Sequence, residues 1–187
     1  MINHGLSTPM LFLLIGMLYE RYHTRKMADY GGMATKFPLF ATFLVFSCLS
    51  SAGLPLLNGF VGEFLCLAGI YEQKDATFRT TLTLLGASGM LLGAWYLFTM
   101  LRNVLFGPVK EPHHEGHHAV KDLSPREWGL LVPLAALCLL IGVYPKVLLR
   151  TSEPEVAKIA TFAKDAKDLR DGKRKAPEKT EHAAARE

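Results

Sequence analysis

The chain has 187 residues, half of them hydrophobic, and a formal net charge of +4 at pH 7. The hydrophobic residues are gathered into long blocks, which is typical of membrane proteins and differs from the amphipathic spacing of a soluble domain. Eleven of the 21 lysines and arginines follow Pro145, where they are mixed with acids. No segment outside the blocks is long enough to build a soluble core with a basic face, which excludes a globular nucleic-acid-binding domain.

The first apolar block runs from His4 to Tyr19 and predicts a membrane helix near residues 4–20. It has neither a basic n-region nor a small-residue cleavage site, so we do not expect a signal peptide. His4 stands at the head of this helix, beside small polar residues that could hold water. A histidine there could relay protons, and the simpler alternative is a hydrogen-bonded residue at the interface.

A polar connection over residues 20–36 holds four basic residues, which predicts a cytoplasmic location. The apolar block that follows predicts membrane structure over residues 37–72, broken at 53–60 by proline and glycines. Its length fits either two short crossings joined by a tight turn or one crossing made of two half-helices. The distribution of basic residues does not choose between these alternatives, so four or five crossings are predicted.

Glu63 is the only fully embedded acid or base in the apolar blocks. A charge at bilayer depth costs about 3 kcal/mol on insertion scales, so such residues usually serve a function. An irregular backbone at membrane depth must be buried in protein or line a wet cavity, and transporters build ion sites from such broken helices. The residues expected to form the break and line the site are Gly53, Pro55, Asn58, Gly59 and Gly62.

Two roles for Glu63 follow from this setting. Desolvation disfavours the charged form of a carboxylate, whereas nearby water or a lysine favours it. An acid subject to both effects can load and release a proton. The alternative is a carboxylate that caps the N-terminus of the second half-helix, where it meets the helix dipole favourably. We favour the proton-carrying role because acids are rare in such surroundings.

Two further apolar blocks predict membrane helices near residues 79–104 and 127–149. In the first of them, Gly89 and Gly93 form a small-xxx-small pair, which predicts a helix-packing face. The string HHEGHH, residues 113–118, is the part of the chain that most resembles a metal-binding site. It has no second cluster at a suitable spacing, so we predict a solvated connector and no metal site. The sequence contains no motif for binding a phosphate, haem or flavin cofactor.

The transmembrane region is thus predicted to occupy residues 1–150. Apolar residues recur at helical spacing over residues 151–170, which predicts an amphipathic helix at a surface. Residues 171–187 are charged and poor in large apolar residues, so they are predicted to be disordered. The predicted fold is all-α: a polytopic transmembrane bundle of four to five hydrophobic helices, one of them discontinuous, with a short amphipathic C-terminal helix and a tail.

Two motifs resemble one known family. The chain reads LYERYHTR over residues 18–25, after HGLS at residues 4–7, and GFVGEF over residues 59–64. These segments resemble the C-terminal part of the antiporter-like subunits of proton-translocating NADH-quinone oxidoreductase, respiratory complex I. Within that family the glutamate at position 63 resembles the chain M branch, because lysine is general there in chain L and in sodium/proton antiporters.

The resemblance implies a membrane-arm subunit in a bacterial inner membrane or an equivalent energy-coupling membrane. It implies one broken crossing over residues 37–72, hence four crossings, and a cytoplasmic connection at residues 20–36. Glu63 would be the proton-bearing carboxylate of a half-channel, and His4 would belong to the polar axis at mid-membrane.

The resemblance also assigns the redox chemistry to other chains. NADH, flavin, iron–sulfur clusters and quinone would be held by partner subunits, so we expect no cofactor and no complete active site in this chain. The expected partners are other membrane subunits of the complex, lipid, water and protons, without nucleic acid. The resemblance covers the end of one repeat and a final helix, so the rest of the proton path is expected outside this sequence.

Two alternatives to a complex I subunit stay open at this point. A sodium/proton antiporter subunit is the nearer one, and the glutamate at position 63 disfavours it. The other, from a different class, is a structural remnant or membrane anchor without transport.

Overall fold

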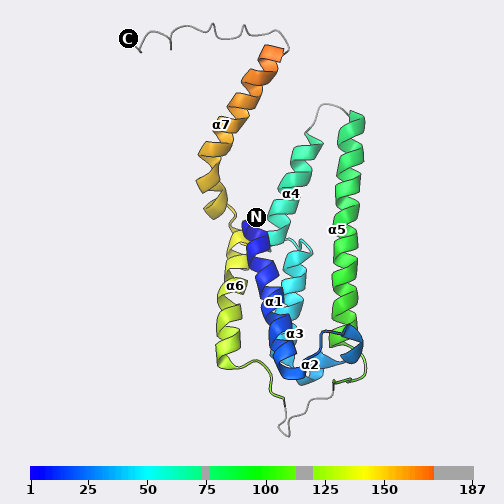
Figure 1. Cartoon of the computed structure of the whole chain (residues 1–187). Helices are drawn as coiled ribbons and strands as arrows, with labels where there is room; N and C mark the ends of the chain where they lie inside the picture. The colour runs from blue at the N-terminus through cyan, green and yellow to red at the C-terminus, as the bar shows by residue number, and fades with distance from the viewer. Residues whose placement is uncertain (73–75, 113–119, 171–187) are drawn as a thin grey trace, which may run out of the picture. The chain divides into compact units, whose positions relative to one another are not determined.

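The computed structural model describes residues 1–72, 76–112 and 120–170, and side chains in the last range as far as Asp168. Across these residues the chain forms α-helices, one short 3-10 helix and no β-strand, so the predicted all-α class is confirmed (Figure 1). The chain divides into two compact units, Met1–Pro145 and a second that begins at Lys146.

The first unit is a bundle in which α1 and α5 run in one direction and α3, α4 and α6 run in the other (Figure 1). Its helices are α1 (Ile2–Tyr22), η1 (Met27–Asp29), α2 (Met33–Lys36), α3 (Pro38–Ser51), α4 (Asn58–Tyr71), α5 (Ala76–Leu105) and α6 (Pro125–Val143). Within the described part of the chain, α1, α5 and α6 are long and apolar enough to cross a membrane, and α3 is a shorter apolar helix.

Helices α3 and α4 form one discontinuous helix. Each has 14 residues and is therefore about 21 Å long, too short to span a hydrocarbon core of about 30 Å alone. They follow one another in the same direction, and α5, with 30 residues, returns beside them and contacts both (Figure 1). This arrangement corresponds to one broken crossing, as the resemblance implied.

The core of the bundle lies where α1, α3, α5 and α6 meet. Its most buried side chains include Met10, Leu14, Cys48, Leu131 and Cys138, all with 0% exposure. The outer surface is also apolar: Leu91 and Trp95 of α5 are 73% and 75% exposed. Large apolar side chains that face outward along a whole helix suit contact with lipid, since lipid tails are as apolar as the side chains.

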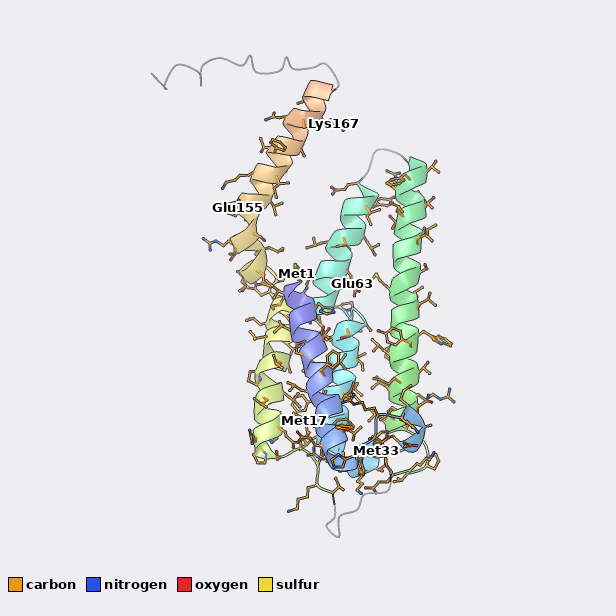
Figure 2. The ribbon with its side chains drawn as sticks, viewed as in Figure 1. Met1, Met17, Met33, Glu63, Glu155 and Lys167 are labelled. Carbon is orange, nitrogen blue, oxygen red and sulfur yellow. The ribbon has the colours of Figure 1, made fainter. Side chains whose placement is uncertain are left out.

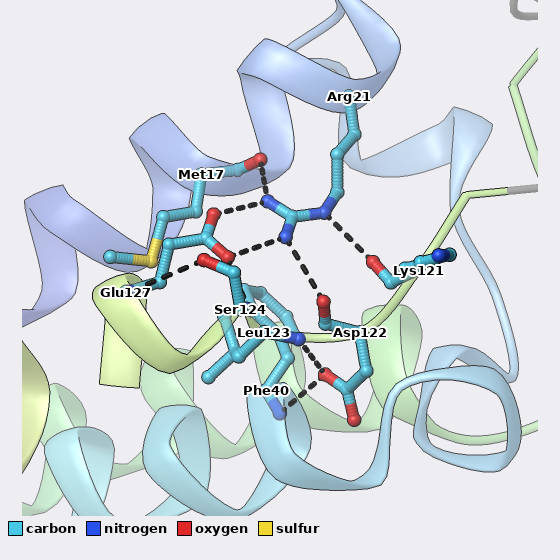
Figure 3. A network of polar contacts seen from close by, with 8 residues as sticks. All are labelled: Met17, Arg21, Phe40, Lys121, Asp122, Leu123, Ser124 and Glu127. Carbon is cyan, nitrogen blue, oxygen red and sulfur yellow. Dashed lines mark hydrogen bonds and ion pairs between the residues drawn. The ribbon is translucent and has the colours of Figure 1, made fainter. Parts of the chain in front are cut away.

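Arg21 fastens the end of α1 to the start of α6. Its guanidinium donates to both carboxylate oxygens of Glu127, with Nη1–Oε1 at 2.7 Å and Nη2–Oε2 at 2.8 Å (Figure 3). It also donates to the backbone carbonyls of Met17, Lys121 and Asp122. The two charged side chains are only 18% and 17% exposed. Bidentate pairs of this kind fix geometry as well as adding energy.

Asp122 extends this network to α3. Its carboxylate accepts hydrogen bonds from the backbone N–H groups of Leu39 and Phe40 (2.8 and 3.1 Å), in the first turn of α3. Figure 3 shows the bond from Phe40. These N–H groups have no partner inside the helix, and a carboxylate there also meets the helix dipole favourably. One charged network therefore holds three helices at the end of the bundle that carries the residue 20–36 connection.

The connection after α1 packs against the segment after α5. Gly31 and Lys110 exchange backbone hydrogen bonds of 3.0 and 2.9 Å. Tyr30 is 6% exposed, and its hydroxyl donates to the carbonyl of Thr24 at 2.8 Å. Burial, together with the nearby charge of Asp29, raises the pKa of Tyr30 to about 12, so the hydroxyl stays a donor at neutral pH.

The second unit begins with α7 (Lys146–Arg170). The apolar pattern predicts a membrane helix at 127–149 and an amphipathic helix at 151–170. In the structure, α6 ends at Val143 and α7 begins three residues later. Pro145 accounts for the difference, because the residue before a proline avoids helical geometry, and Tyr144 has φ −129° and ψ 69°. The predicted disorder of 171–187 lies outside the described residues.

Candidate functional site

The break between α3 and α4 is an ordered turn. Two of its residues have left-handed backbones, Gly53 at φ +73° and Leu56 at φ +76°. This conformation is free for glycine but costs about 1–2 kcal/mol for other residues. The N–H groups of Leu54 and Leu57 are paired with the carbonyls of Leu49 and Leu54, both at 3.1 Å. Pro55 lies between them and has no N–H to leave unpaired.

Asn58, the first residue of α4, joins three helices at the break. Its side chain is fully buried, and its Nδ2 donates to the carbonyl of Asn3 at 3.0 Å. The Nδ2 of Asn3 donates back to the carbonyl of Asn58 at 2.7 Å, and the Ser50 hydroxyl donates to Oδ1 of Asn58. Hydrogen-bonded buried amides of this kind favour one arrangement, because alternatives leave polar groups unpaired.

Replacing Asn58 by leucine is expected to destabilise the bundle by about 1–3 kcal/mol, since it removes the acceptor of the buried Ser50 hydroxyl and one donor to the Asn3 carbonyl. Unfolding of the purified chain in mild detergent, followed by loss of helical circular dichroism, measures this effect. Thr99→Val is the matched control, because the Thr99 hydroxyl is exposed and bonds only to its own helix. Equal stability of the two variants would contradict the role of Asn58.

Glu63 lies on the second turn of α4, with its carboxyl group against the break (Figure 2). A Cβ atom added to Gly53 would collide with Oε2 of Glu63, so the carboxyl occupies the space that the glycine leaves. This Oε2 is buried and has no hydrogen-bond partner within the described part of the chain. Burying a polar atom without a partner is costly, so this oxygen is the atom of the site that most needs a hydrogen-bond partner.

The capping role considered for Glu63 does not fit this geometry. The N-cap of α4 is Leu57, and no side chain makes a capping hydrogen bond there. Glu63 is the sixth residue of the helix, whereas the effect of the helix dipole is confined to the first turn. The carboxyl group therefore has no structural task at the helix end.

An open cavity of about 770 Å³ brings Glu63 and His4 to one space. The cavity offers hydroxyl groups from several helices, and a polar space of this size can hold water. His4 is exposed, while Glu63 is half-buried. The polar lining residues are Asn3, His4, Ser7 and Thr8 from α1, Ser50 and Ser51 from α3, Glu63 and Cys66 from α4, and Tyr96 from α5.

Small residues let the other helices approach the break closely. A Cβ atom at Gly59 would collide with the carbonyl oxygen of Ser50, and one at Gly62 would lie 3.3 Å from Nδ2 of Asn3. On α6, a Cβ atom at Gly142 would collide with the backbone of Leu56. The break is therefore enclosed by α1, the end of α3 and the end of α6.

The structure gathers His4 and Glu63 with the residues expected around the break. It also pairs Asn3, one of the small polar residues beside His4, with Asn58, and it adds Ser50. Sequence reasoning missed Ser50 because a serine in an apolar helix does not reveal its partner. The close approach on α5 is at Gly86, where a Cβ atom would meet Leu67 at 2.9 Å.

Two other sequence predictions concern places away from this site. Gly89 has nothing within 4 Å of an added Cβ atom and Gly93 meets only Tyr96 of its own helix, so their role in helix packing stays a prediction. HHEGHH lies outside the described residues. In the ranges that are described, no group of three His, Cys, Asp or Glu residues could hold a metal ion.

Comparison with known proteins places this site in a family. Residues 1–81, which hold α1 and the whole broken helix, match the family described as NADH:quinone oxidoreductase/Mrp antiporter, TM. The matched range contains His4, Glu63 and every residue expected at the break. The resemblance inferred from the two motifs is thereby confirmed, and the chain is an integral membrane protein.

Curated members of the family extend the similarity beyond residue 81. The chain is 37% identical over 159 residues to NADH-quinone oxidoreductase subunit M of Rhodobacter capsulatus, covering 85% of this chain and 30% of that protein. It is 40% identical over 149 residues to subunit M of Rickettsia prowazekii, covering 80% and 29%. It is 34% identical over 164 residues to NADH-ubiquinone oxidoreductase chain 4 of Arabidopsis thaliana, covering 88% and 32%. The chain thus spans less than a third of the length of these relatives.

A solved structure shares the fold. One chain of respiratory complex I from Thermus thermophilus with bound NADH is 36% identical to this chain, with a TM-score of 0.65. The match covers 81% of this chain and 30% of that one. The antiporter-family bundle described above is therefore an arrangement also found in a respiratory complex.

Proposed function

We propose that the chain is part of the membrane arm of an NADH-quinone oxidoreductase and forms part of a proton-translocating half-channel. The observation that carries this proposal is the buried, unpartnered carboxylate oxygen of Glu63, held at a helix break beside a hydroxyl-lined cavity. The similarity to proteins named subunit M and chain 4 supports the assignment to this enzyme complex. In this proposal, electron transfer from NADH to quinone takes place in other subunits and drives the proton movement.

The proposed path uses groups that already line the cavity. Glu63 holds the proton at Oε2 when the space beside it is dry, because desolvation disfavours the charged form. When water enters, the proton passes along water and the hydroxyl groups to His4, whose imidazole ring has one nitrogen that can accept a proton and one that can donate a proton. Each transfer moves a proton alone, so this chain needs no redox group of its own. NADH, flavin, iron–sulfur clusters and quinone are assigned to partner subunits.

The test of this function is proton pumping by the assembled complex in proteoliposomes, measured together with quinone reduction, for the wild type and Glu63→Gln. The proposed function predicts fewer protons moved per electron in the variant. Unchanged pumping per electron would leave Glu63 as a packing residue and the chain as a structural part or membrane anchor.

His4→Ala is expected to reduce coupled activity less than Glu63→Gln does. Water and hydroxyl groups in the cavity can take over part of the proton transfer that His4 performs. The same pumping assay measures this loss, and His4→Gln separates proton relay from simple polarity. Full coupled activity in both histidine variants would contradict a relay role for His4.

A sodium/proton antiporter subunit is the second candidate, because the matched family is described by both activities. A sodium/proton antiporter requires that proton movement respond to the sodium concentration at constant pH. Proton pumping by the assembled complex that is independent of sodium would exclude the antiporter. Sodium-dependent proton movement that Glu63→Gln abolishes would favour the antiporter.

A further inference from the structure

Helix α7 carries an exposed apolar face. After Pro154, the side chains of Val156, Ile159 and Phe162 are 59%, 67% and 77% exposed. At 100° of rotation per residue, these three residues and two alanines, Ala163 and Ala166, fall within a sector of about 120° on one side of the helix. Such a face is unfavourable in water over this length, so it requires an apolar partner.

The charged residues of α7 are ordered around this sector. Lys158 lies just beyond Phe162 at one edge, and Lys167 lies just beyond Val156 at the other. Asp168 lies opposite the centre of the apolar sector, beside Lys164. Lysines at both edges can lay their aliphatic stems along an apolar surface while their ammonium groups reach a polar boundary.

Glu155 is the one acid that falls inside the apolar sector. Its Oε1 accepts a hydrogen bond from Nζ of Lys158 at 2.7 Å, so its charge is directed to the edge of the sector. Both side chains are exposed, at 69% and 72%. The apolar face is therefore continuous from Val156 onward, and the opposite edge, at Lys167, lies away from Glu155.

The covalent connection determines which apolar partner is present. Helix α7 begins at Lys146, and the membrane helix α6 ends at Val143, so only Tyr144 and Pro145 separate them. A tether this short keeps α7 at a high effective concentration next to the bilayer surface. The whole of α7 has six basic and four acidic residues, which favours a surface carrying phosphate groups.

We propose that residues 155–168 bind the phospholipid surface as an interfacial helix. The sector of Val156, Ile159 and Phe162 faces the acyl chains, about 5–10 Å into the boundary with the headgroups, and Lys158 and Lys167 contact lipid phosphates. The proposal needs a membrane location for α6 but does not depend on proton translocation.

The test uses the full chain, reconstituted in vesicles of phosphatidylcholine and phosphatidylglycerol, with one fluorophore on α7. Cys66→Ala removes the exposed cysteine, while Cys48 and Cys138 are buried and do not compete for the label. The label is attached at Ile159→Cys, on the apolar sector, or at Thr161→Cys, on the polar side, as a matched control. Iodide serves as the quencher in water, and a spin-labelled phospholipid serves as the quencher in the membrane.

The expected result is that the label at position 159 is quenched several-fold more by the lipid probe than by iodide, with the reverse at position 161. Adding Phe162→Asp is expected to restore iodide quenching at position 159, whereas adding Lys164→Ala is not. Equal iodide quenching at both positions would show a helix free in water and overturn the proposal. Protection of position 159 from both quenchers would show a protein partner and would also overturn it.

Discussion

Glu63→Gln is expected to slow proton movement through this half-channel by about 10²-fold, the lower end of what a positioned acid–base group contributes. Glutamine keeps the size and polarity of the side chain but cannot carry a transferable proton. NADH oxidation by an artificial electron acceptor is expected to continue, because that chemistry is assigned to partner subunits. Coupled quinone reduction is expected to fall together with pumping.

Two further variants make this result specific. Glu72→Gln makes the same chemical change at an exposed residue at the other end of α4 and is expected to leave pumping intact. Glu63→Asp keeps the titratable group but draws it back from Gly53, so partial pumping is expected. Normal pumping by Glu63→Gln in a fully assembled complex would contradict the proposed function.

Gly53→Ala is the second change expected to have a large effect. The backbone at Gly53 has φ +73°, where an alanine costs about 1–2 kcal/mol, and the new Cβ atom would collide with Oε2 of Glu63. The carboxyl group must then move or the break must open, so both stability and pumping are expected to fall. Denaturation of the purified chain and pumping by the assembled complex measure the two effects separately.

The collision and the backbone strain can be distinguished by a double-mutant cycle. In a Glu63→Ala background the collision is absent, so Gly53→Ala is expected to cost only the backbone term. Gly69→Ala is the control within α4, because an added Cβ atom there meets nothing within 4 Å, and alanine favours a helix. An identical cost of Gly53→Ala in both backgrounds would show that Glu63 does not contact residue 53.

The membrane class and the break could be predicted because both are local properties of the chain. Long apolar blocks can be recognised in any short stretch of the sequence. A carboxylate that follows glycine and proline can be recognised inside such a block. The break was predicted at 53–60, whereas α4 already begins at Asn58. Gly59 was placed in the break for its flexibility, but it lies in the helix, where its missing side chain makes room for the carbonyl of Ser50.

The contacts that shape the site could not be predicted, because they join distant residues. Asn3 and Asn58 are 55 residues apart, and Arg21 and Glu127 are 106 residues apart. The direction of α4 after the break was also undetermined, since a turn at Gly53 permits a hairpin as well as a continued crossing. Packing of α5 along both half-helices favours the continued crossing.

The charged end of the bundle and the break between α3 and α4 are held by bonds of different strength. At one end Arg21 binds a carboxylate and three carbonyls, and charge-assisted bonds of this type are about twice as strong as neutral ones. At the break, Asn58 is held by neutral hydrogen bonds, each contributing about 0.5–1.5 kcal/mol net. Separating α4 from α1 and α3 at the break therefore gives up weaker hydrogen bonds than separating α1 from α6 at the charged end.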